Sequence, residues 1–475
     1  MRRHSRPKTA ASLLRVLAIA CLLSLDACAS LPDAERQLAA QPAQSVVVEG
    51  ASGQASRALG RQLMAQAGKA GDTDMLQRHL QAEQVINAGS PLVAGNRLRL
   101  LSDGPATYAA MFAAIDQARH HIHLETYIFE DGEIGEQFAT RLLERERAGV
   151  QVRVLYDSVG GLGTAKEFFE RLRAGGIQVV EFNPINPLEG KRKGWQVNQR
   201  DHRKLLIVDG RSAFVGGINI SDSYASSPFS SPRLKRAGKS GKAAQGSGWR
   251  DTHLQIDGPV VAEFQQLFLA SWAKQRGPVI AAKGLFPGMS PQGAEVVRAI
   301  GSGADEPESL IFLTLMSAIA HAEQSIHLTI AYFAPDPQLR QALLDAARRG
   351  VEVELLLPRH TDSWVIFNIG RSHYQELLDG GVKIHERGGP VMHAKTATID
   401  GVWSTVGSTN LDWRSLLHND ELNAVVVGSD FAAQMETMFE RDLVESTAIQ
   451  AEQWRQRSLT WRIKEFSARL VEYWF

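Results

Sequence analysis

Residues 202–219 read HRKLLIVDGRSAFVGGIN, and residues 393–410 read HAKTATIDGVWSTVGSTN. Both stretches contain a histidine, a lysine two positions later, an aspartate after four intervening residues, and a final asparagine, with each landmark 191 positions from its counterpart. The run between lysine and aspartate predicts a strand, and the Asp-Gly pair that ends it is typical of a hairpin turn. Two complete copies of so long a pattern indicate an internal duplication.

Shorter similarities extend the duplication on the N-terminal side of each motif. Residues 122–124 read IHL, and the same three letters recur at residues 326–328. In both halves a helical stretch, a Gly-Val pair and a strand-like run follow. Alternating helices and strands favour an α/β sheet covered by helices. We therefore predict two similar α/β halves, one over residues 95–290 and the other over residues 291–450.

Composition narrows the class of protein. The chain of 475 residues has 52 basic and 52 acidic residues and only two cysteines. A balanced charge argues against a general nucleic-acid coat, which needs a basic excess. Two cysteines permit at most one disulfide, so neither a disulfide scaffold nor a zinc site built of thiolates is expected.

The N-terminus reads as an export signal. Residues 1–15 carry five basic residues and no acidic one, and an apolar run of about ten residues follows. This run is too short to span a bilayer, which needs about 20 residues, so we predict a secretory signal peptide over residues 1–27. The segment ends Leu25-Asp26-Ala27-Cys28, which resembles a bacterial lipoprotein signal with Cys28 as the lipidated residue; ordinary cleavage after Ala29 and an uncleaved basic anchor are the alternatives.

This interpretation predicts an exported protein that is membrane-associated on the periplasmic side, as a lipoprotein. Residues 28–94 are rich in Ala, Gln and Gly, and we expect them to form a tether with helical segments. At the other end, residues 451–475 place apolar side chains at helical spacing with basic residues between them. They predict an amphipathic helix that either lies in a membrane interface or packs on the domain. The basic segment 226–248 is either a solvated loop or a contact to anionic headgroups.

The repeated histidine and lysine can bind and transform an anion. On a strand, positions i and i+2 share a face, so His202 lies beside Lys204, and His393 lies beside Lys395. A charged lysine offers no lone pair to a metal, whereas two lysines and two asparagines can surround a phosphate while the histidines act in covalent and acid–base steps. Each aspartate, Asp209 or Asp400, is either part of this chemistry or a turn residue.

The duplicated motif resembles the HKD signature of the phospholipase D superfamily, over roughly residues 95–450. Segments that look like bacterial cardiolipin synthases narrow the resemblance: residues 124–129 (LETYIF), 249–253 (WRDTH), 331–336 (AYFAPD) and 370–374 (GRSHY). The resemblance implies an α/β fold of two phospholipase D-type halves, each a mixed sheet flanked by helices, packed around one shared active site. It implies no cofactor and no metal.

The resemblance also implies roles for individual residues. His202 is expected to attack the phosphorus and His393 to act as general acid and base, although the near-equivalent motifs do not order them. Acidic residues some 25–50 positions beyond each histidine, Asp251 and Glu421, are expected to orient it. The remaining expected site residues fall into two groups. The catalytic motifs contribute Lys204, Asp209, Lys395 and Asp400, and the substrate side contributes Asn219, Asn410, Ser408, Glu125 and Tyr332. The first copy has Gly217 where the second copy has Ser408, so the first copy lacks one possible hydrogen-bond donor to the phosphate.

The expected reaction joins two phosphatidylglycerol molecules into cardiolipin and releases glycerol through a phosphohistidine. Three alternatives remain at this stage. A phospholipase D would pass the phosphatidyl group to water and give phosphatidic acid, a related nuclease would cleave nucleic acid, and a lipid-binding protein would have kept only the fold. The expected partners are phospholipid substrates and a membrane surface, with no nucleic acid; the sequence does not indicate an oligomeric state.

Overall fold

The computed structural model describes residues 30–39, 45–53, 55–67, 73–87, 89–186, 198–229, 248–281, 284–306 and 308–474. The signal peptide predicted over residues 1–27, the lipidation site predicted at Cys28 and most of the basic segment 226–248 lie outside these ranges. Within the described ranges, no helix has both the length and the apolar character needed to cross a membrane.

The first half is a mixed sheet. Its strands run in the spatial order β6-β5-β4-β8-β9-β10-β3, in which β4, β5 and β6 are parallel and the other neighbours are antiparallel. Their bounds are β3 Leu92–Leu101, β4 His121–Thr126, β5 Gln151–Asp157, β6 Gln178–Phe182, β8 Lys204–Val208, β9 Ser212–Gly216 and β10 His253–Asp257.

The second half repeats this order as β14-β13-β12-β15-β16-β17-β11. The bounds are β11 Glu295–Ser302, β12 Ser325–Ile330, β13 Glu352–Pro358, β14 Lys383–Arg387, β15 Lys395–Ile399, β16 Trp403–Gly407 and β17 Asn419–Val427, and β18 (Ser446–Ala448) adds to the outer edge. The inner strands β3 and β11 pair antiparallel, so the sheet is continuous from one half to the other. The predicted α/β fold of two similar halves is confirmed.

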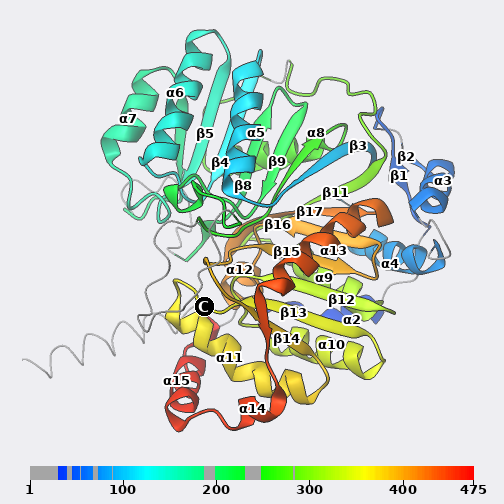
Figure 1. The fold of residues 1–475 in the computed structure, drawn as a ribbon. Helices are drawn as coiled ribbons and strands as arrows, with labels where there is room; N and C mark the ends of the chain where they lie inside the picture. Colours follow the sequence, from blue (N-terminus) through cyan, green and yellow to red (C-terminus); the bar gives the residue numbers. More distant parts are fainter. Residues whose placement is uncertain are drawn as a thin grey trace, which may run out of the picture.

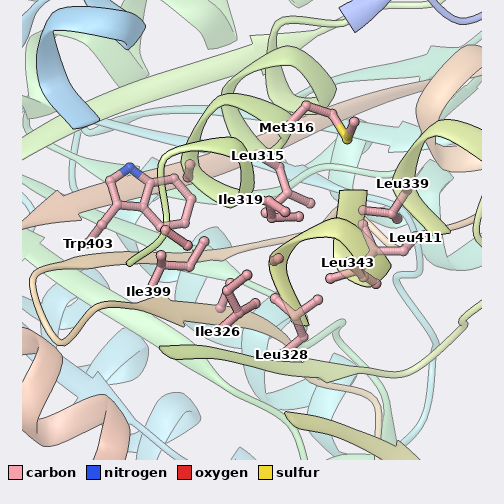
Figure 2. Close-up of a cluster of buried hydrophobic side chains, with 14 of the residues drawn as sticks. Leu315, Met316, Ile319, Ile326, Leu328, Leu339, Leu343, Ile399, Trp403 and Leu411 are labelled. Carbon is pink, nitrogen blue, oxygen red and sulfur yellow. The ribbon is translucent and has the colours of Figure 1, made fainter. Parts of the chain in front are cut away.

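Helices cover the sheet in the same pattern in each half (Figure 1). The outer helices are α5 (Gly104–Gln117), α6 (Glu133–Arg147) and α7 (Lys166–Ala174) in the first half, and α9 (Leu310–Ala320), α10 (Pro337–Arg348) and α11 (Trp364–Asp379) in the second. Figure 2 shows the packing in the second half, where Leu315 and Ile319 of α9 meet Ile326 and Leu328 of β12. Residues 311–319 of α9 are all buried, so this helix is enclosed on every side, as its apolar sequence predicts.

A third core joins the halves. Helix α8 (Val261–Lys274) contributes Phe264 and Phe268 to it, and α13 (Ser429–Val444) contributes Phe431 and Met435. The same cluster contains Leu205 of the first half and Leu422 of the second. Because one buried apolar cluster includes side chains from both halves, separating them would expose it to water, and this fixes their relative position.

The N-terminal segment is part of this fold, and the prediction of a tether over residues 28–94 was wrong. It forms α2 (Ala34–Ala39), β1 (Val48–Glu49), β2 (Ala55–Ser56), α3 (Arg57–Ala67) and α4 (Thr73–Ile86), and its last residues begin β3, ahead of the predicted boundary at residue 95. Leu76 and Leu80 of α4 are buried in the core of the second half. The composition of this segment did not indicate that it docks on the second half, because an Ala- and Gln-rich helix needs only a few apolar residues on one face to pack against a domain.

The C-terminal segment forms two helices and a short turn instead of one helix. These are α14 (Ala451–Arg455), α15 (Leu459–Arg469) and η3 (Glu472–Trp474). Helix α15 packs along α11 through buried Ala468, which contacts Ile366 and Ile369. His373 of α11 holds the end of the chain through a 2.8 Å contact between its Nε2 and Glu472 Oε1. The alternative in which this segment packs on the domain is confirmed for one face, and the other face is exposed. The alternative in which it lies in a membrane interface stays a prediction.

The remaining short elements lie near the junction of the halves. They are β7 (Arg200–Asp201), η2 (Asp222–Tyr224) and α12 (Trp413–Leu417). Strand β7 pairs in parallel with the start of β17, so that Arg200 is opposite Asn419. This pairing carries a first-half strand into contact with the second half just ahead of His202.

If α4 is a structural element, removing its core contact should destabilise the whole protein. We expect Leu76→Ala to lower the free energy of unfolding by about 2–5 kcal/mol, the usual cost of truncating a buried leucine. Gln77→Ala, at the exposed neighbouring position, should change it by less than about 0.5 kcal/mol. Urea unfolding monitored by circular dichroism measures both. Equal, small effects of the two changes would restore the interpretation of this segment as a tether.

Candidate active site

The two motif histidines line one cavity between the halves. The cavity has a volume of about 260 Å³, and both His202 and His393 lie in its wall with only 8% and 5% of their surface exposed. Further lining residues come from both halves in similar positions: Tyr127 and Asn219 from the first, Tyr332 and Asn410 from the second. The duplicated sequence therefore builds one site rather than two.

Each histidine is held by a buried carboxylate of the opposite half. His202 Nδ1 lies 3.0 Å from Glu421 Oε1, and His393 Nδ1 lies 2.8 Å from Asp251 Oδ2. When Nδ1–H donates to the carboxylate, Nε2 is left without a proton and able to attack or to accept one. Both carboxylates are fully buried, so water does not compete for them.

This pairing corrects the sequence-based expectation, which gave each histidine the acid that follows it in its own half. Backbone pairing between the halves explains the exchange. The N–H of His202 donates to Asp420 O, and that of His393 donates to Arg250 O. Glu421 follows Asp420 and Asp251 follows Arg250, so each histidine is placed next to the residue that precedes its carboxylate.

Gly217 and Ser408 differ because of these carboxylates. A Cβ atom at Gly217 would stand 2.2 Å from Asp251 Oδ1, so only glycine leaves room for Asp251 beside His393. At the matching position Ser408 is fully buried and its hydroxyl donates to Glu421 Oε2. The assignment of Ser408 to substrate binding was wrong, because its hydroxyl is used to fix a carboxylate behind the histidine.

The two lysines are buried at the centre of the site. Lys204 Nζ donates to the backbone oxygen of His202, and Lys395 Nζ donates to that of His393. Burial lowers the pKa of Lys204 to about 7 and that of Lys395 to about 8. A phosphate dianion or diester that enters would favour the charged ammonium groups and so be bound more strongly.

The histidines and their carboxylates respond differently to this environment. Burial, reinforced by the neighbouring lysine charges, lowers the pKa of both histidines, so that both are neutral at neutral pH. Burial raises the pKa of Glu421 to about 7. Burial also acts on Asp251, but the hydrogen bond of His393 and the charge of Lys395 outweigh it and hold the pKa of Asp251 below its usual value. Asp251 is therefore the more firmly ionised of the two acids.

The motif aspartates are turn residues, and their assignment to the catalytic set was wrong. Asp209 and Asp400 both have φ of 54°, and the glycine after each also has a positive φ, as a two-residue hairpin turn requires. The carboxylate of Asp209 accepts from the backbone N–H groups of residues 119–121. That of Asp400 accepts from residues 323–325 and lies 2.8 Å from His79 Nε2. Each aspartate thus ties the hairpin to the loop before β4 or β12.

Glu125 does not reach the cavity. Its strand face is covered by α8, and its carboxylate lies 3.8 Å from Arg203 NH1, fully buried. Tyr127, two residues on and beyond the end of β4, does line the cavity, with its ring 5.0 Å from that of His202. Tyr332 is its counterpart, 5.7 Å from His393, and its hydroxyl donates to Asp362 Oδ1. The assignment of Glu125 to the substrate side was wrong, whereas Tyr332 lies in the cavity wall as expected.

Several residues of the site were not expected from the motifs. Tyr224 lies with its hydroxyl 3.1 Å from His393 Nδ1, and Trp249 stands with its ring 5.5 Å from the same histidine. Arg200 and Arg414 complete the wall on the side of Asn419. Trp249 is part of the WRDTH segment and Arg200 precedes the first motif by two residues, so proximity to a motif was the available signal.

The asparagines are well placed to donate into the cavity. The backbone N–H of Ile128 donates to Asn219 Oδ1, which leaves the amide NH₂ as the donor group of that side chain. Asn410 also lines the cavity. In the described part of the chain, no group of three or more His, Cys, Asp or Glu side chains could hold a metal ion.

The fold and the duplicated site define a phospholipase D-type enzyme, and comparisons with known proteins agree. The family described as "Cardiolipin synthase, PLD-like domain" matches residues 111–228 and 315–443. A cardiolipin synthase of Geobacillus kaustophilus is 35% identical over 384 residues, covering 80% of this chain and 73% of that protein. Cardiolipin synthase 2 of Bacillus anthracis is 33% identical over 405 residues, covering 84% and 75%.

Among solved structures, phosphatidylserine synthase of Haemophilus influenzae has a similar fold, with a TM-score of 0.60 at 13% identity, covering 82% of this chain and 99% of that one. The chain belongs to the cardiolipin synthase family of the phospholipase D superfamily. It is accordingly a cardiolipin synthase-like phosphatidyltransferase.

The close approach of Gly217 to Asp251 can be tested by adding one methyl group. We expect Gly217→Ala to push Asp251 away from His393 and to lower kcat by about tenfold or more, since an unoriented acid–base group loses much of its contribution. Gly163→Ala is the matched control, because a Cβ there meets nothing within 4 Å. Wild-type kcat in a folded Gly217→Ala enzyme would show that the Asp251 position is not needed.

Proposed function

We propose that this enzyme makes cardiolipin from two phosphatidylglycerol molecules. In the first step one histidine Nε2 attacks the phosphorus of the donor lipid and the phosphorus–oxygen bond to glycerol breaks. The other histidine, which takes up a proton from solvent on its Nε2 when the anionic donor binds, gives that proton to the leaving glycerol and becomes neutral. In the second step that histidine takes the proton of the acceptor's hydroxyl, the new oxygen–phosphorus bond forms, and the phosphorus–nitrogen bond breaks. The supporting observation is one cavity lined by two histidines, each held by a buried carboxylate.

The surroundings of the two histidines support different roles for them. We assign His202 as the nucleophile and His393 as the general acid and base. The firmly ionised Asp251 beside His393 stabilises the imidazolium that an acid–base residue must form. Glu421 beside His202 has a raised pKa, so it carries less negative charge than Asp251 while it still orients the imidazole ring. A nucleophile must be held in that orientation, but unlike the acid–base residue it does not have to carry a proton from one step to the next.

The lysines and asparagines would bind the phosphate oxygens. Lys204 and Lys395 supply positive charge close to both histidines, and the amides of Asn219 and Asn410 supply neutral donors from either side. Fixed donors aimed at the developing charge are a main source of catalysis in such sites. Hydrolysis to phosphatidic acid uses the same groups with water as acceptor, so only the products separate transfer from hydrolysis.

The product assay is therefore the direct test. The purified enzyme with labelled phosphatidylglycerol vesicles is expected to give cardiolipin and free glycerol, and His202→Ala and His393→Ala are each expected to reduce turnover by at least about a thousandfold, because both act in one site. Lipids are separated by chromatography and glycerol is measured in the same sample. Phosphatidic acid without cardiolipin would identify a hydrolase, and substantial activity in either variant would contradict the shared site.

We also propose that the exposed face of α15 binds the membrane that holds the substrate. Four of its apolar side chains are 59–71% exposed and follow helical spacing: Leu459, Ile463, Phe466 and Leu470. An apolar stripe with basic residues nearby, here Arg462 and Lys464, is typical of helices that lie in an anionic interface. The opposite face packs on the domain through Ala468, and the Arg457–Glu465 ion pair joins α15 to the turn that precedes it.

Membrane binding through α15 predicts a specific loss. Phe466→Asp should weaken binding to vesicles that contain phosphatidylglycerol by about tenfold, since it removes an exposed aromatic side chain that would enter the interface and adds a charge that anionic lipids repel. Val279→Asp is the control, because Val279 is 99% exposed but lies outside α15. Vesicle flotation measures both. Equal binding by the two variants would exclude this face as the contact.

Export and lipidation at Cys28 extend this proposal. A lipid-modified N-terminus would keep the domain at the periplasmic face of a membrane, and α15 would then orient it. The mass of the mature chain tests this part separately: an N-terminus at Ala29 or beyond, without an acylated Cys28, would contradict it.

A further inference from the structure

Two arginines in the cavity are surplus to the duplicated site. Arg200 and Arg414 both line the cavity wall, next to His202 and Asn419. The residues that surround the reacting phosphate occur in pairs, one in each half. The arginines do not: at the 191-residue offset of the motifs, Arg200 corresponds to Val391 and Arg414 to Ser223. The cavity therefore has two arginine side chains in its wall that have no counterpart in the other copy of the repeat.

The guanidinium group of Arg200 is incompletely paired. The side chain is 1% exposed, and within the described residues its Nε and NH1 atoms have no hydrogen-bond partner, while NH2 donates to Asn183 O. Its nearest carboxylate, Asp157, lies 3.6 Å from NH1. Buried donors are normally satisfied, so two unpartnered N–H groups on a side chain of the cavity wall leave part of the positive charge of Arg200 uncompensated.

Asp157 compensates this charge only in part. Its oxygens already accept from the backbone N–H groups of Val159, Gly160 and Asp201, and burial raises its pKa to about 6. Arg414 is paired with a neutral group, Asn198 Oδ1, at 2.8 Å. The two arginines are close enough that the charge of Arg414, added to burial, lowers the pKa of Arg200. The acid that interacts with Arg414 is Asp412, which accepts from the backbone N–H of Ser415 and whose pKa burial raises to about 7. Since both acids have raised pKa values, they balance the two guanidinium charges only in part, and a further anion is attracted.

The proposed reaction supplies that anion. A donor phosphatidylglycerol brings the phosphate that reacts, and the acceptor brings a second phosphodiester that stays intact. In the product a single glycerol bridge separates the two phosphates, so both must occupy neighbouring positions while the second step takes place. We infer that Arg200 and Arg414 form a subsite for the unreacting phosphate of the acceptor phospholipid.

This subsite would also favour transfer over hydrolysis. Binding the acceptor phosphate holds its hydroxyl in the cavity, so that attack on the phosphohistidine becomes effectively intramolecular. Water and simple alcohols lack the phosphate and gain nothing from the arginines. The inference depends on the proposed function, since it concerns the acceptor of that same reaction.

A competition assay tests it. Phosphatidylglycerol vesicles are incubated with the full-length enzyme and ethanol, and cardiolipin and phosphatidylethanol are measured in one sample. Both products arise from the same donor step, so their ratio does not depend on how much enzyme is folded. Arg414→Gln is expected to lower the ratio of cardiolipin to phosphatidylethanol by at least about tenfold, and Arg414→Lys, which keeps the charge but not the planar donors, to lower it less.

Arg348→Gln is the control, because its side chain on α10 is 60% exposed and pairs with Asp345 at the surface; its ratio should equal that of the wild type. An unchanged ratio in Arg414→Gln, whether both products fall together or neither falls, would overturn the acceptor subsite alone. Phosphatidylethanol without any cardiolipin from the wild-type enzyme would contradict the proposed function, and the acceptor subsite with it.

Discussion

The hydrogen bond between each histidine and a carboxylate of the other half is the interaction on which the site depends. Glu421 reaches His202 and Asp251 reaches His393, so neither half has a correctly oriented histidine by itself. The carboxylates are fully buried and would be costly to leave unpaired. The halves must therefore be held in a fixed relation, which the shared core of α8 and α13 and the β3–β11 pairing provide. The packing that holds the two halves together is therefore also what orients the histidines.

The sequence predicted what is local and what is repeated. The strands before Asp209 and Asp400, the hairpin turns, the two α/β halves and the meeting of both histidines in one cavity all follow from a motif that occurs twice. It did not predict which acid meets which histidine, since that depends on how β7 pairs with β17 across the junction. For the same reason Glu125 was misplaced: alternation gives the face of a strand, but not that α8 covers this face. The docking of α4 was missed because few of its residues are apolar.

The departures from symmetry are as informative as the repeat. Gly217 and Ser408 occupy matching positions but serve opposite needs, one making room for Asp251 and the other bonding to Glu421. The two carboxylates in turn differ in pKa, so two nearly identical histidines meet different electrostatic surroundings. A duplicated site begins with two equivalent groups, whereas a two-step transfer needs a nucleophile and a proton carrier. Small substitutions behind the histidines are enough to give the two histidines different electrostatic surroundings, because a buried carboxylate acts strongly on its neighbour.

The C-terminal segment, which we propose binds the membrane, packs directly on residues of the cavity wall. Ala468 of α15 contacts Ile366 of α11, and Ile366 lines the cavity. Tyr473 in η3 packs against Trp413 of α12, the residue before Arg414. An apolar face that enters the interface would therefore hold the rim of the cavity at the depth of lipid headgroups, where a phosphodiester can reach the histidines while its acyl chains stay in the bilayer. Such an arrangement avoids the cost of drawing two whole lipids into water, which grows with every exposed CH₂ group. The cavity then has to accommodate only polar headgroups, in keeping with the histidine, arginine and asparagine side chains in its wall.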